Sequence, residues 1–164
     1  MRRLLPITVT LLLAACGFQL RGAYTLPFDT LHITLPEIAP LHALLKRNIE
    51  ASTRTRIVDD AKSAQAILTV TGDAPEKKVL SLNSAGQVRE YELVRIFSFR
   101  IHDSANRDLM PPGRIVIRRE ITFSDAQVLS KESEEVLIWR DIQDDLVQQL
   151  LRRMAAAKSK PEAG

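Results

Sequence analysis

The chain lacks several features that would place it in a common structural or functional class. It has one cysteine in 164 residues, so it cannot form an internal disulfide even in an oxidising compartment. It has no run of about 20 apolar residues, which excludes an ordinary membrane-spanning helix. Six glycines and few low-complexity stretches argue against disorder. The exception is the stretch 155–164, which is predicted to be a flexible tail.

Motifs for catalysis and metal binding are also missing. The sequence contains no H-E-x-x-H pair, no G-x-S-x-G elbow and no glycine-rich phosphate loop. His32, His42 and His102 fall in different predicted elements and are not spaced as ligands of one metal ion. Two pairs of adjacent aspartates point apart, which favours a solvated role over acid-base work. We therefore predict no enzymatic activity, no catalytic residue, no cofactor and no metal site.

The first fifteen residues have the three parts of a secretory signal. Arg2 and Arg3 give a positive start, residues 4–13 are apolar, and the small-residue segment 13–15 directly precedes Cys16. This pattern resembles a bacterial lipobox, in which the signal is cut before a cysteine that carries a diacylglycerol on sulfur and an acyl chain on its new amino group. Because two or more acyl chains hold a protein stably at a membrane, Cys16 is predicted to be a durable anchor. The alternative is a secreted protein with a cysteine near its cleavage site.

The residues around the anchor predict the compartment and the charge of the mature chain. Bacterial lipoproteins with Asp after the cysteine stay at the inner membrane, so Gly17 predicts transport to the outer membrane. Loss of Arg2 and Arg3 leaves 21 of the 23 basic residues against 20 acidic ones. The alkaline isoelectric point is therefore partly due to the signal, and no nucleic-acid partner is predicted. The remaining 149 residues suit one domain with a modest core.

Hydrophobic periodicity in the mature chain predicts a two-layer α+β domain. Strands are expected at 30–35, 66–71 with a continuation at 78–82 after an interruption, 89–103 and 114–123. Helices are expected at 40–53 and 130–154. This order predicts a roughly four-stranded, mostly antiparallel sheet with both helices packed on one face. Pairing of the first two strands stays open.

Some residues of this domain can be assigned to a sheet face or a helix face. The sheet face without helices carries Val94, Ile96 and Val116 among polar residues, so it is expected to be free for a partner or wet. The last helix has an apolar stripe made of Val136, Trp139, Ile142, Leu146, Val147, Leu150 and Met154. The chain thus divides into a signal (1–15), an acylated N-terminus and tether (16–29), a single α+β domain (30–154) and the tail.

Three segments resemble the LptE (RlpB) family of lipopolysaccharide-assembly lipoproteins. The segment Cys-Gly-Phe-Gln-Leu-Arg at 16–21 is similar to that family's C-G-aromatic-x-L-R start. Residues 86–91, Gly-Gln-Val-Arg-Glu-Tyr, resemble its G-Q-x-x-E-Y segment entering a long strand. The stretch 119–154 is similar to its final strand, lysine-containing loop and C-terminal helix. The resemblance covers nearly the whole mature chain in element order.

This resemblance implies a non-enzymatic role in lipopolysaccharide export. Family members plug a large outer-membrane β-barrel of the LptD type in a one-to-one complex, help the barrel fold, and bind lipopolysaccharide on its way to the outer leaflet. The resemblance therefore implies an outer-membrane location, with the domain on the periplasmic side and in the barrel lumen. A tether to the same membrane raises the effective concentration of the domain near the barrel, so modest contacts suffice.

Basic side chains beside apolar surface are the natural candidates for lipopolysaccharide contact, because lipid A offers phosphates and acyl chains. Lys131 matches the lysine that the family carries just before its last helix, where basic character is associated with lipopolysaccharide contact. Arg100 and Arg118 are candidates from the residues alone. The segment 83–85, Asn-Ser-Ala, departs from the family where a basic residue can precede G-Q, which puts a phosphate contact there in doubt.

Two other functional classes stay open. The chain could be the lipoprotein pilot of a different outer-membrane secretion machine. It could also be an anchored periplasmic enzyme whose site shows no recognisable motif. Co-purification with a large barrel would favour the main prediction, recovery of a secretin would favour a pilot, and turnover abolished by one substitution would favour an enzyme.

Overall fold

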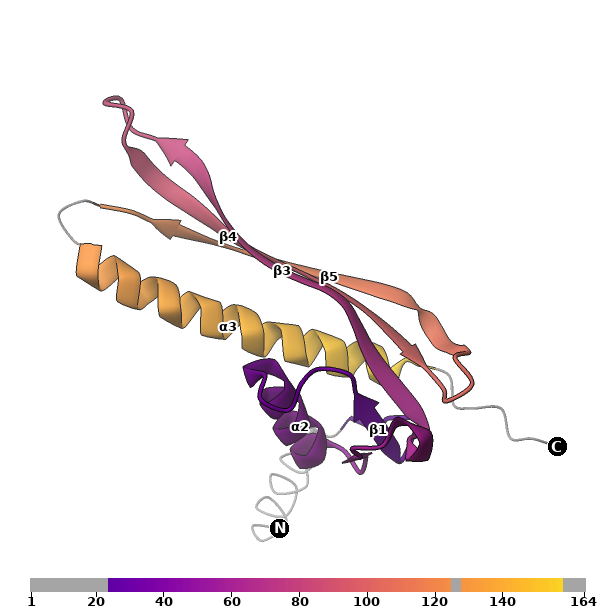
Figure 1. Cartoon of the computed structure of the whole chain (residues 1–164). Coiled ribbons are helices and arrows are strands. Elements are labelled where there is room, and N and C mark those ends of the chain that lie inside the picture. Colours follow the sequence, from indigo (N-terminus) through magenta and orange to yellow (C-terminus); the bar gives the residue numbers. More distant parts are fainter. Residues whose placement is uncertain (1–23, 125–127, 158–164) are drawn as a thin grey trace, which may run out of the picture.

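The computed structural model describes residues 24–124 and 128–157 (Figure 1). These residues form one five-stranded sheet with the order β2-β1-β3-β4-β5, together with two α-helices and a short 3-10 turn. The strands are β1 (Thr30–Ile33), β2 (Arg56–Ile57), β3 (Ala66–Leu82), β4 (Val88–His102) and β5 (Asp108–Thr122). The helices are α2 (Pro40–Ser52) and α3 (Val128–Ala155), and the turn is η1 (Ala61–Ser63).

The predicted α+β fold is confirmed, with five strands in place of the expected four. The additional strand, β2, has two residues and pairs in parallel with β1, Thr30 lying opposite Arg56 and Leu31 opposite Ile57. Two residues are too few to produce a detectable alternation, so the sequence could not indicate this strand. The first strand also pairs in parallel with β3, which settles the strand order that the sequence left open.

The interruption predicted after residue 71 is wrong, because β3 is one strand of 17 residues. A register shift between Val70 and Gly72 places an extra residue, Thr71, in β3, and pairing with β4 then continues through Pro75. Proline is tolerated here because β1 pairs with β3 only as far as Leu68, so the outer edge of β3 needs no backbone donor beyond that point.

The last strand was predicted to begin at residue 114, but β5 begins at Asp108, so the connection from β4 is shorter than expected. Pro111 and Pro112 lie within this strand, at a register shift between the pairs Ile101–Met110 and Phe99–Gly113. Since β5 is the last strand of the sheet, its prolines leave no ladder hydrogen bond unmade on the outer side. Both corrections thus have one cause, the placement of prolines at sheet edges.

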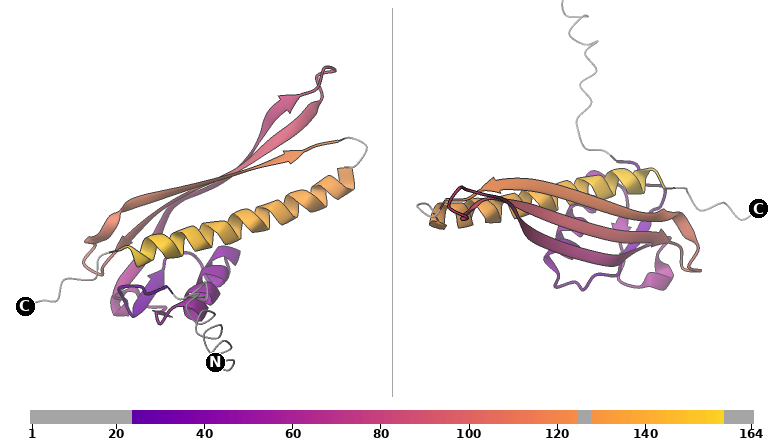
Figure 2. Two further views of the ribbon diagram at one scale, coloured as in Figure 1. Left: turned by 180° about the vertical axis from the view of Figure 1, so that it is seen from behind. Right: turned by 90° about the horizontal axis from the view of Figure 1, so that it is seen from above.

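One face of the sheet is covered by helix and the other is open. Figure 2 shows α3 running along the sheet on one side, where it contacts β5 and β4. The second helix, α2, packs against α3 and β2 rather than across the long strands. Cross-strand register puts Val94, Ile96 and Val116 on the open face, as predicted. Val94 is nevertheless buried, since it lies between Glu76 and Arg118 on the neighbouring strands.

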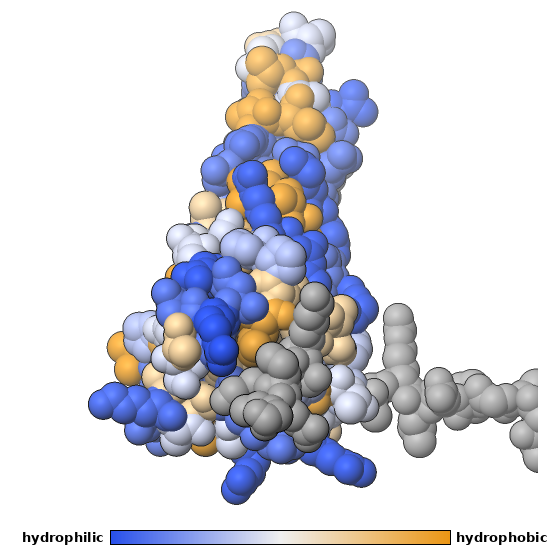
Figure 3. Space-filling view, turned by 90° about the vertical axis from the view of Figure 1, so that its right-hand side faces the viewer, coloured by the Kyte–Doolittle hydropathy of each residue, from blue (hydrophilic) through white to orange (hydrophobic). Residues whose placement is uncertain are grey.

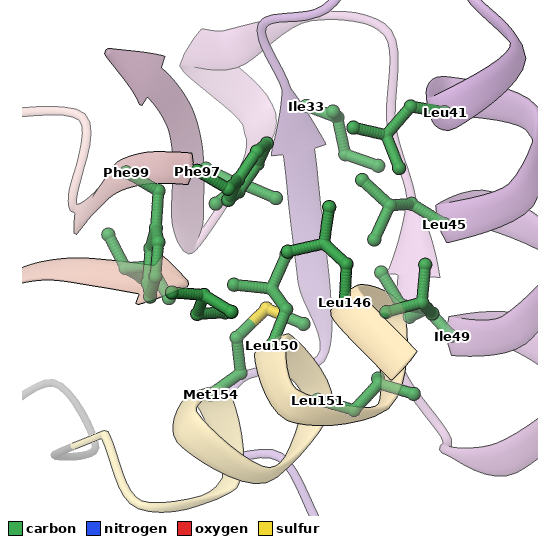
Figure 4. Packing of buried hydrophobic residues seen from close by; sticks show 14 of the residues in the cluster. Ile33, Leu41, Leu45, Ile49, Phe97, Phe99, Leu146, Leu150, Leu151 and Met154 are labelled. Carbon is green, nitrogen blue, oxygen red and sulfur yellow. The ribbon is translucent and has the colours of Figure 1, made fainter. Parts of the chain in front are cut away.

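The hydrophobic core lies where α2, the second half of α3 and the sheet meet. Figure 4 shows Leu45 and Ile49 of α2 directed toward Leu146 and Leu150 of α3, with Phe97 of β4 on the other side. All five of these side chains are fully buried. Burying each one stabilises the fold by roughly 1.5–3 kcal/mol relative to leaving it in water.

The stretch predicted as a tether contributes to this core at its C-terminal end. Leu26 and Phe28 are buried members of the hydrophobic cluster. The backbone N–H of Tyr24 donates to the carbonyl of Ser52 at 3.0 Å, and the Thr55 hydroxyl donates to the carbonyl of Phe28 at 2.7 Å. Packing of the domain therefore extends at least to Tyr24, ahead of the start at residue 30 that the sequence indicated.

Candidate functional site

The long strands and α3 extend well beyond the core and form what we call the distal end, residues 73–95, 117–124 and 128–141 (Figure 1). Few side chains of the β3–β4 hairpin are buried there, because neither helix lies over β3 beyond the core. Val79, Leu80 and Leu82 are exposed near the hairpin tip. Figure 3 shows apolar and hydrophilic colour side by side toward this end. The distal end thus combines open apolar surface with charge.

Lys131 lies at this end, in the first turns of α3. Its Nζ donates to Glu134 Oε2 at 2.7 Å and to Thr122 Oγ1 at 3.1 Å. Only 16% of the lysine side chain is exposed, against 47% for Glu134. The lysine therefore ties the start of α3 to the end of β5, and an anionic ligand would compete with Glu134 for its charge.

A second lysine, which sequence reasoning did not select, lies across the same region. Lys77 Nζ of β3 is 2.6 Å from Glu135 Oε2 of α3 and 4.3 Å from the centre of the Tyr91 ring. Tyr91 in turn packs edge-on against Phe123, with ring centres 5.6 Å apart. These contacts join three elements that are distant in sequence. Strict alternation from Ala66, Leu68 and Val70 would place Lys77 on the opposite face, because the extra residue Thr71 shifts the register of β3, so no local pattern indicated this contact.

The three lipopolysaccharide candidates do not form one cluster. Arg118 lies opposite Val94 on the open face, with 63% of its side chain exposed and a long 3.6 Å ion pair to Glu92. Arg100 donates twice to Asp108 Oδ1, at 2.8 and 3.1 Å, at the start of β5. Since 14 residues separate Asp108 from Thr122, the partner of Lys131, Arg100 lies roughly 45 Å from Lys131 along the strand, at about 3.3 Å per residue. The structure brings Arg118 nearer to Lys131 and leaves Arg100 at the opposite end.

The segment 83–85, which differs from the family pattern, forms the turn of the β3–β4 hairpin. Asn83 Oδ1 accepts hydrogen bonds from the backbone N–H groups of Ala85 and Gln87, both at 2.9 Å. Gly86 has φ of 79°, a left-handed conformation that favours glycine. The glycine of the G-Q segment is thus required by the turn, and the asparagine at its start serves as a turn acceptor rather than a ligand.

An arginine between two aspartates holds the middle of α3 on the sheet. Arg119 Nε of β5 donates to Asp141 Oδ2 at 2.8 Å, and its Nη2 donates to Asp145 Oδ2 at 3.1 Å. The hydrogen bond that Arg119 donates to Asp141, with help from the one it donates to Asp145, raises the pKa of Arg119 above its ordinary value. Arg119 therefore stays charged at any physiological pH and is a structural link rather than a titrating group.

The described residues hold little that could support other chemistry. His32 Nδ1 contacts the carbonyl of Val58 at 3.1 Å, and His102 contacts Thr69 Oγ1 and the carbonyl of Asp103, both at 2.9 Å. In residues 24–124 and 128–157, no three His, Cys, Asp or Glu side chains gather as a metal site would require. No helix in the same ranges is long and apolar enough to cross a membrane.

Comparison with known proteins agrees with the resemblance found in the sequence. The model of the lipopolysaccharide-assembly family LptE matches residues 28–154. The chain belongs to the LptE family. LptE proteins named as LPS-assembly lipoproteins from Yersinia enterocolitica and Pectobacterium atrosepticum are 26% and 27% identical to it. These matches cover 88% and 93% of this chain, and 70% and 83% of theirs.

Solved structures agree with this assignment to the LptE family. Lipoprotein B from Nitrosomonas europaea has a TM-score of 0.74 and 39% identity, over 85% of this chain and 91% of its own. The rare lipoprotein B from Shewanella oneidensis has a TM-score of 0.67 and 26% identity, over 78% and 95%. The two-helix, mostly antiparallel architecture is therefore that of LptE proteins. The signal and Cys16 lie outside the described residues, so lipid attachment stays a prediction.

Proposed function

We propose that this chain is an outer-membrane lipoprotein that plugs an LptD-type β-barrel, assists its assembly, and binds lipopolysaccharide during transport to the outer leaflet. The observation that carries the proposal is the match to the LptE family over residues 28–154, nearly the whole of the domain. The shape supports it, because an elongated sheet with one open face presents a long surface to a surrounding wall. Cys16 would hold this domain at the membrane that contains the barrel.

The barrel partner is tested by affinity purification of the lipidated chain from detergent-solubilised outer membrane. We expect a large β-barrel protein in one-to-one ratio that survives washing. Recovery of the chain alone would contradict the proposal. Recovery of a secretin would instead support the function of a pilot for a secretion channel. Depletion of the chain should also lower surface lipopolysaccharide and raise permeability to large hydrophobic compounds.

We propose Lys131 as the main lipopolysaccharide contact. It places a cation beside the exposed apolar residues of the distal end, the combination that a phosphorylated, acylated ligand needs. Arg118 is a secondary candidate because it is largely exposed and its ion pair is long. Arg100 is the weakest of the three, since it lies at the opposite end of the sheet from the exposed residues Val79, Leu80 and Leu82.

The lysine is tested by charge changes on both sides of its ion pair. In binding assays with purified lipopolysaccharide, Lys131→Glu should weaken binding, while Glu134→Gln should strengthen it by freeing the lysine charge. Lys46→Glu, a charge reversal at an exposed position of α2, is the matched control and should bind as the unmodified chain does. Unchanged binding by Lys131→Glu would remove Lys131 from the site.

A further inference from the structure

The two long hairpins of the sheet end in turns of the same construction, residues 83–87 and 103–107. In each turn, the side-chain oxygen of the first residue accepts hydrogen bonds from the backbone N–H groups of the third and fifth residues, all at 2.9 Å. The fourth residue has a positive φ in both, 79° at Gly86 and 61° at Asn106. The two sequences, Asn-Ser-Ala-Gly-Gln and Asp-Ser-Ala-Asn-Arg, can therefore be compared position by position.

The two turns differ in charge. The 103–107 turn has an ion pair between its first and fifth residues, in which Arg107 Nε donates to Asp103 Oδ2 at 2.8 Å. The 83–87 turn has a neutral amide pair at the same two positions, in which Asn83 Nδ2 donates to Gln87 Oε1 at 2.9 Å. Because the same backbone hydrogen bonds form with either pair, the geometry of the turn does not require the neutral one.

The absence of charge extends from the 83–87 turn into both of its strands. Residues 79–88 contain no Asp, Glu, Lys or Arg, and we call them the neutral tip. Val79, Leu80 and Leu82 of this tip are 54%, 46% and 56% exposed, and Figure 1 shows the hairpin projecting away from the start of α3. Taking an ion pair out of water costs far more free energy than taking out a hydrogen-bonded amide pair. The neutral tip is therefore suited to apolar surroundings.

Cations lie where the neutral tip joins the rest of the sheet. Lys77 and Lys78 precede the tip and Arg89 follows it. Each of the two lysines pairs with a glutamate at 2.6 Å. Arg89 is exposed, and within residues 24–124 and 128–157 its side chain forms no hydrogen bond or ion pair. This order, an apolar tip followed by an open guanidinium, matches an amphiphile whose phosphates lie next to its acyl chains.

We propose that the neutral tip inserts among the acyl chains of lipopolysaccharide, with Arg89 at the level of the phosphates, an inference that rests on the proposed function. It assigns the acyl part of the ligand to a segment of its own, separate from the cation at Lys131. The amide pair of Asn83 and Gln87 keeps the turn closed without carrying charge into the acyl layer.

The phospholipid leaflet that would hold the anchor fits the neutral tip less well, because it adjoins the other end of the domain. The backbone N–H of Tyr24, where the described chain begins, donates to Ser52 at the end of α2. Leu82 lies 14 residues along β3 from Leu68 in the core, about 46 Å at 3.3 Å per residue. The lipid around the tip is therefore the transported ligand rather than the anchoring leaflet.

The exposed apolar residues at the start of α3 are also less suited to acyl chains. Leu129, Val136 and Leu137 are 80%, 52% and 61% exposed, which contradicts the prediction that Val136 belongs to the packed stripe. Charged residues, Glu132 and Glu134, lie between them in the sequence. Acyl chains around this part of the helix would have to surround carboxylates as well.

The test measures polarity at both turns in the full-length, lipidated chain held in phosphatidylcholine nanodiscs. In Ser84→Cys the new thiol is the only free one, because diacylglycerol occupies the sulfur of Cys16. A polarity-sensitive fluorophore on it should shift its emission to shorter wavelength when lipopolysaccharide is added, and should not shift with deacylated lipopolysaccharide. Ser104→Cys, which labels the same position of the other turn, is the matched control and should not shift with either.

A charge placed on the neutral tip tests the same contact through affinity. Ala85→Asp should weaken lipopolysaccharide binding at least about tenfold, because the carboxylate would have to enter the acyl layer. Ala105→Asp adds the same charge at the same position of the other turn and should bind as the unmodified chain does. The exchange Asn83→Asp/Gly86→Asn/Gln87→Arg gives the tip a turn sequence that forms the same hydrogen bonds, so it should keep the thermal midpoint and weaken binding.

The outcomes separate this inference from the function on which it rests. If the unmodified chain binds no lipopolysaccharide, that part of the proposed function fails. If it binds but the Ser84 label does not shift, or Ala85→Asp binds as tightly as the unmodified chain, the inference is overturned while the function stands. A shift in nanodiscs before lipopolysaccharide is added would show that the tip meets phospholipid, and equal losses in Ala85→Asp and Ala105→Asp would show a distant effect of charge. Either result would also overturn it.

Discussion

At the residue scale, the packing around Gly113 leaves no room for a side chain at that position. A Cβ atom there would lie 2.7 Å from Phe99 Cε1 and closer still to Cζ, so the buried ring of Phe99 occupies the space that any side chain needs. We expect Gly113→Ala to destabilise the fold by about 1–3 kcal/mol through overpacking. Chemical denaturation of the chain from residue 17 onward, which contains the described core, measures this cost.

The matched control for this substitution is Gly72→Ala on β3. A Cβ atom at Gly72 would lie 3.8 Å from Ser98 Cβ, an ordinary contact distance. Alanine also suits an extended strand better than glycine does. Gly72→Ala should therefore leave stability unchanged or slightly raised, and an equal loss in both variants would contradict the role given to Phe99.

A second prediction at this scale concerns the turn between β4 and β5. The buried carboxylate of Asp103 accepts hydrogen bonds from the backbone N–H groups of Ala105 and Arg107 and from Arg107 Nε, between 2.8 and 2.9 Å. The backbone hydrogen bond from Arg107, followed by that from its guanidinium, lowers the pKa of Asp103 below its ordinary value of 3.8. The ionised carboxylate is thus favoured by folding.

The lowered pKa of Asp103 determines how the stability of the fold changes with pH. A depressed folded-state pKa gives stability that is fully present above the unfolded value, about 3.8, and is lost as the pH falls through the lower folded value. Asp103→Asn should lower the thermal midpoint at pH 7 and reduce the further loss between about pH 4 and pH 2. Thermal unfolding at several pH values in this range measures the effect. If the thermal midpoints of the two proteins fell in parallel with pH, the role given to Asp103 would be contradicted.

At the element scale, α3 is one helix with two different environments. Its second half closes the core, while its first half is held to the sheet by ion pairs from Lys77 and Arg119. We expect Leu150→Ala to cost about 2–5 kcal/mol, because it leaves a cavity in a fully buried site. Leu129→Ala should change the free energy of unfolding by no more than about 0.5 kcal/mol. Urea denaturation of both variants checks the contrast, which comparable losses would refute.

At the scale of the whole molecule, anchoring and folding are separate properties. Within residues 24–124 and 128–157, the hydrophobic core already brings together both helices and the sheet, so we expect it to fold without the anchor at Cys16. Cys16→Ala should therefore move the protein from the outer membrane to the periplasmic fraction while leaving its circular dichroism spectrum and thermal midpoint unchanged. Fractionation with an immunoblot tests the location, and a loss of folding would show that the anchor also stabilises the domain.

The sequence alone predicted the elements whose burial follows from local periodicity. Alternation over residues 89–103 predicted β4 and its buried side, and helical spacing together with Pro40 predicted the start of α2. These patterns can be recognised in the sequence because one face of each element is buried along most of its length. The segments 16–21 and 86–91, in combination with the stretch 119–154, indicated the LptE family.

The tertiary structure decided what depends on neighbours distant in the chain. The parallel pairing of β1 with β2 and β3, the proline-containing edges of β3 and β5, and the contact of Lys77 with Glu135 all join residues whose partners no local pattern specifies. Whether Val136 is buried or exposed was decided in the same way, since helical spacing gives a side chain its direction, whereas burial depends on what covers it. Because α2 covers only half of α3, one periodic stripe became part core and part open surface.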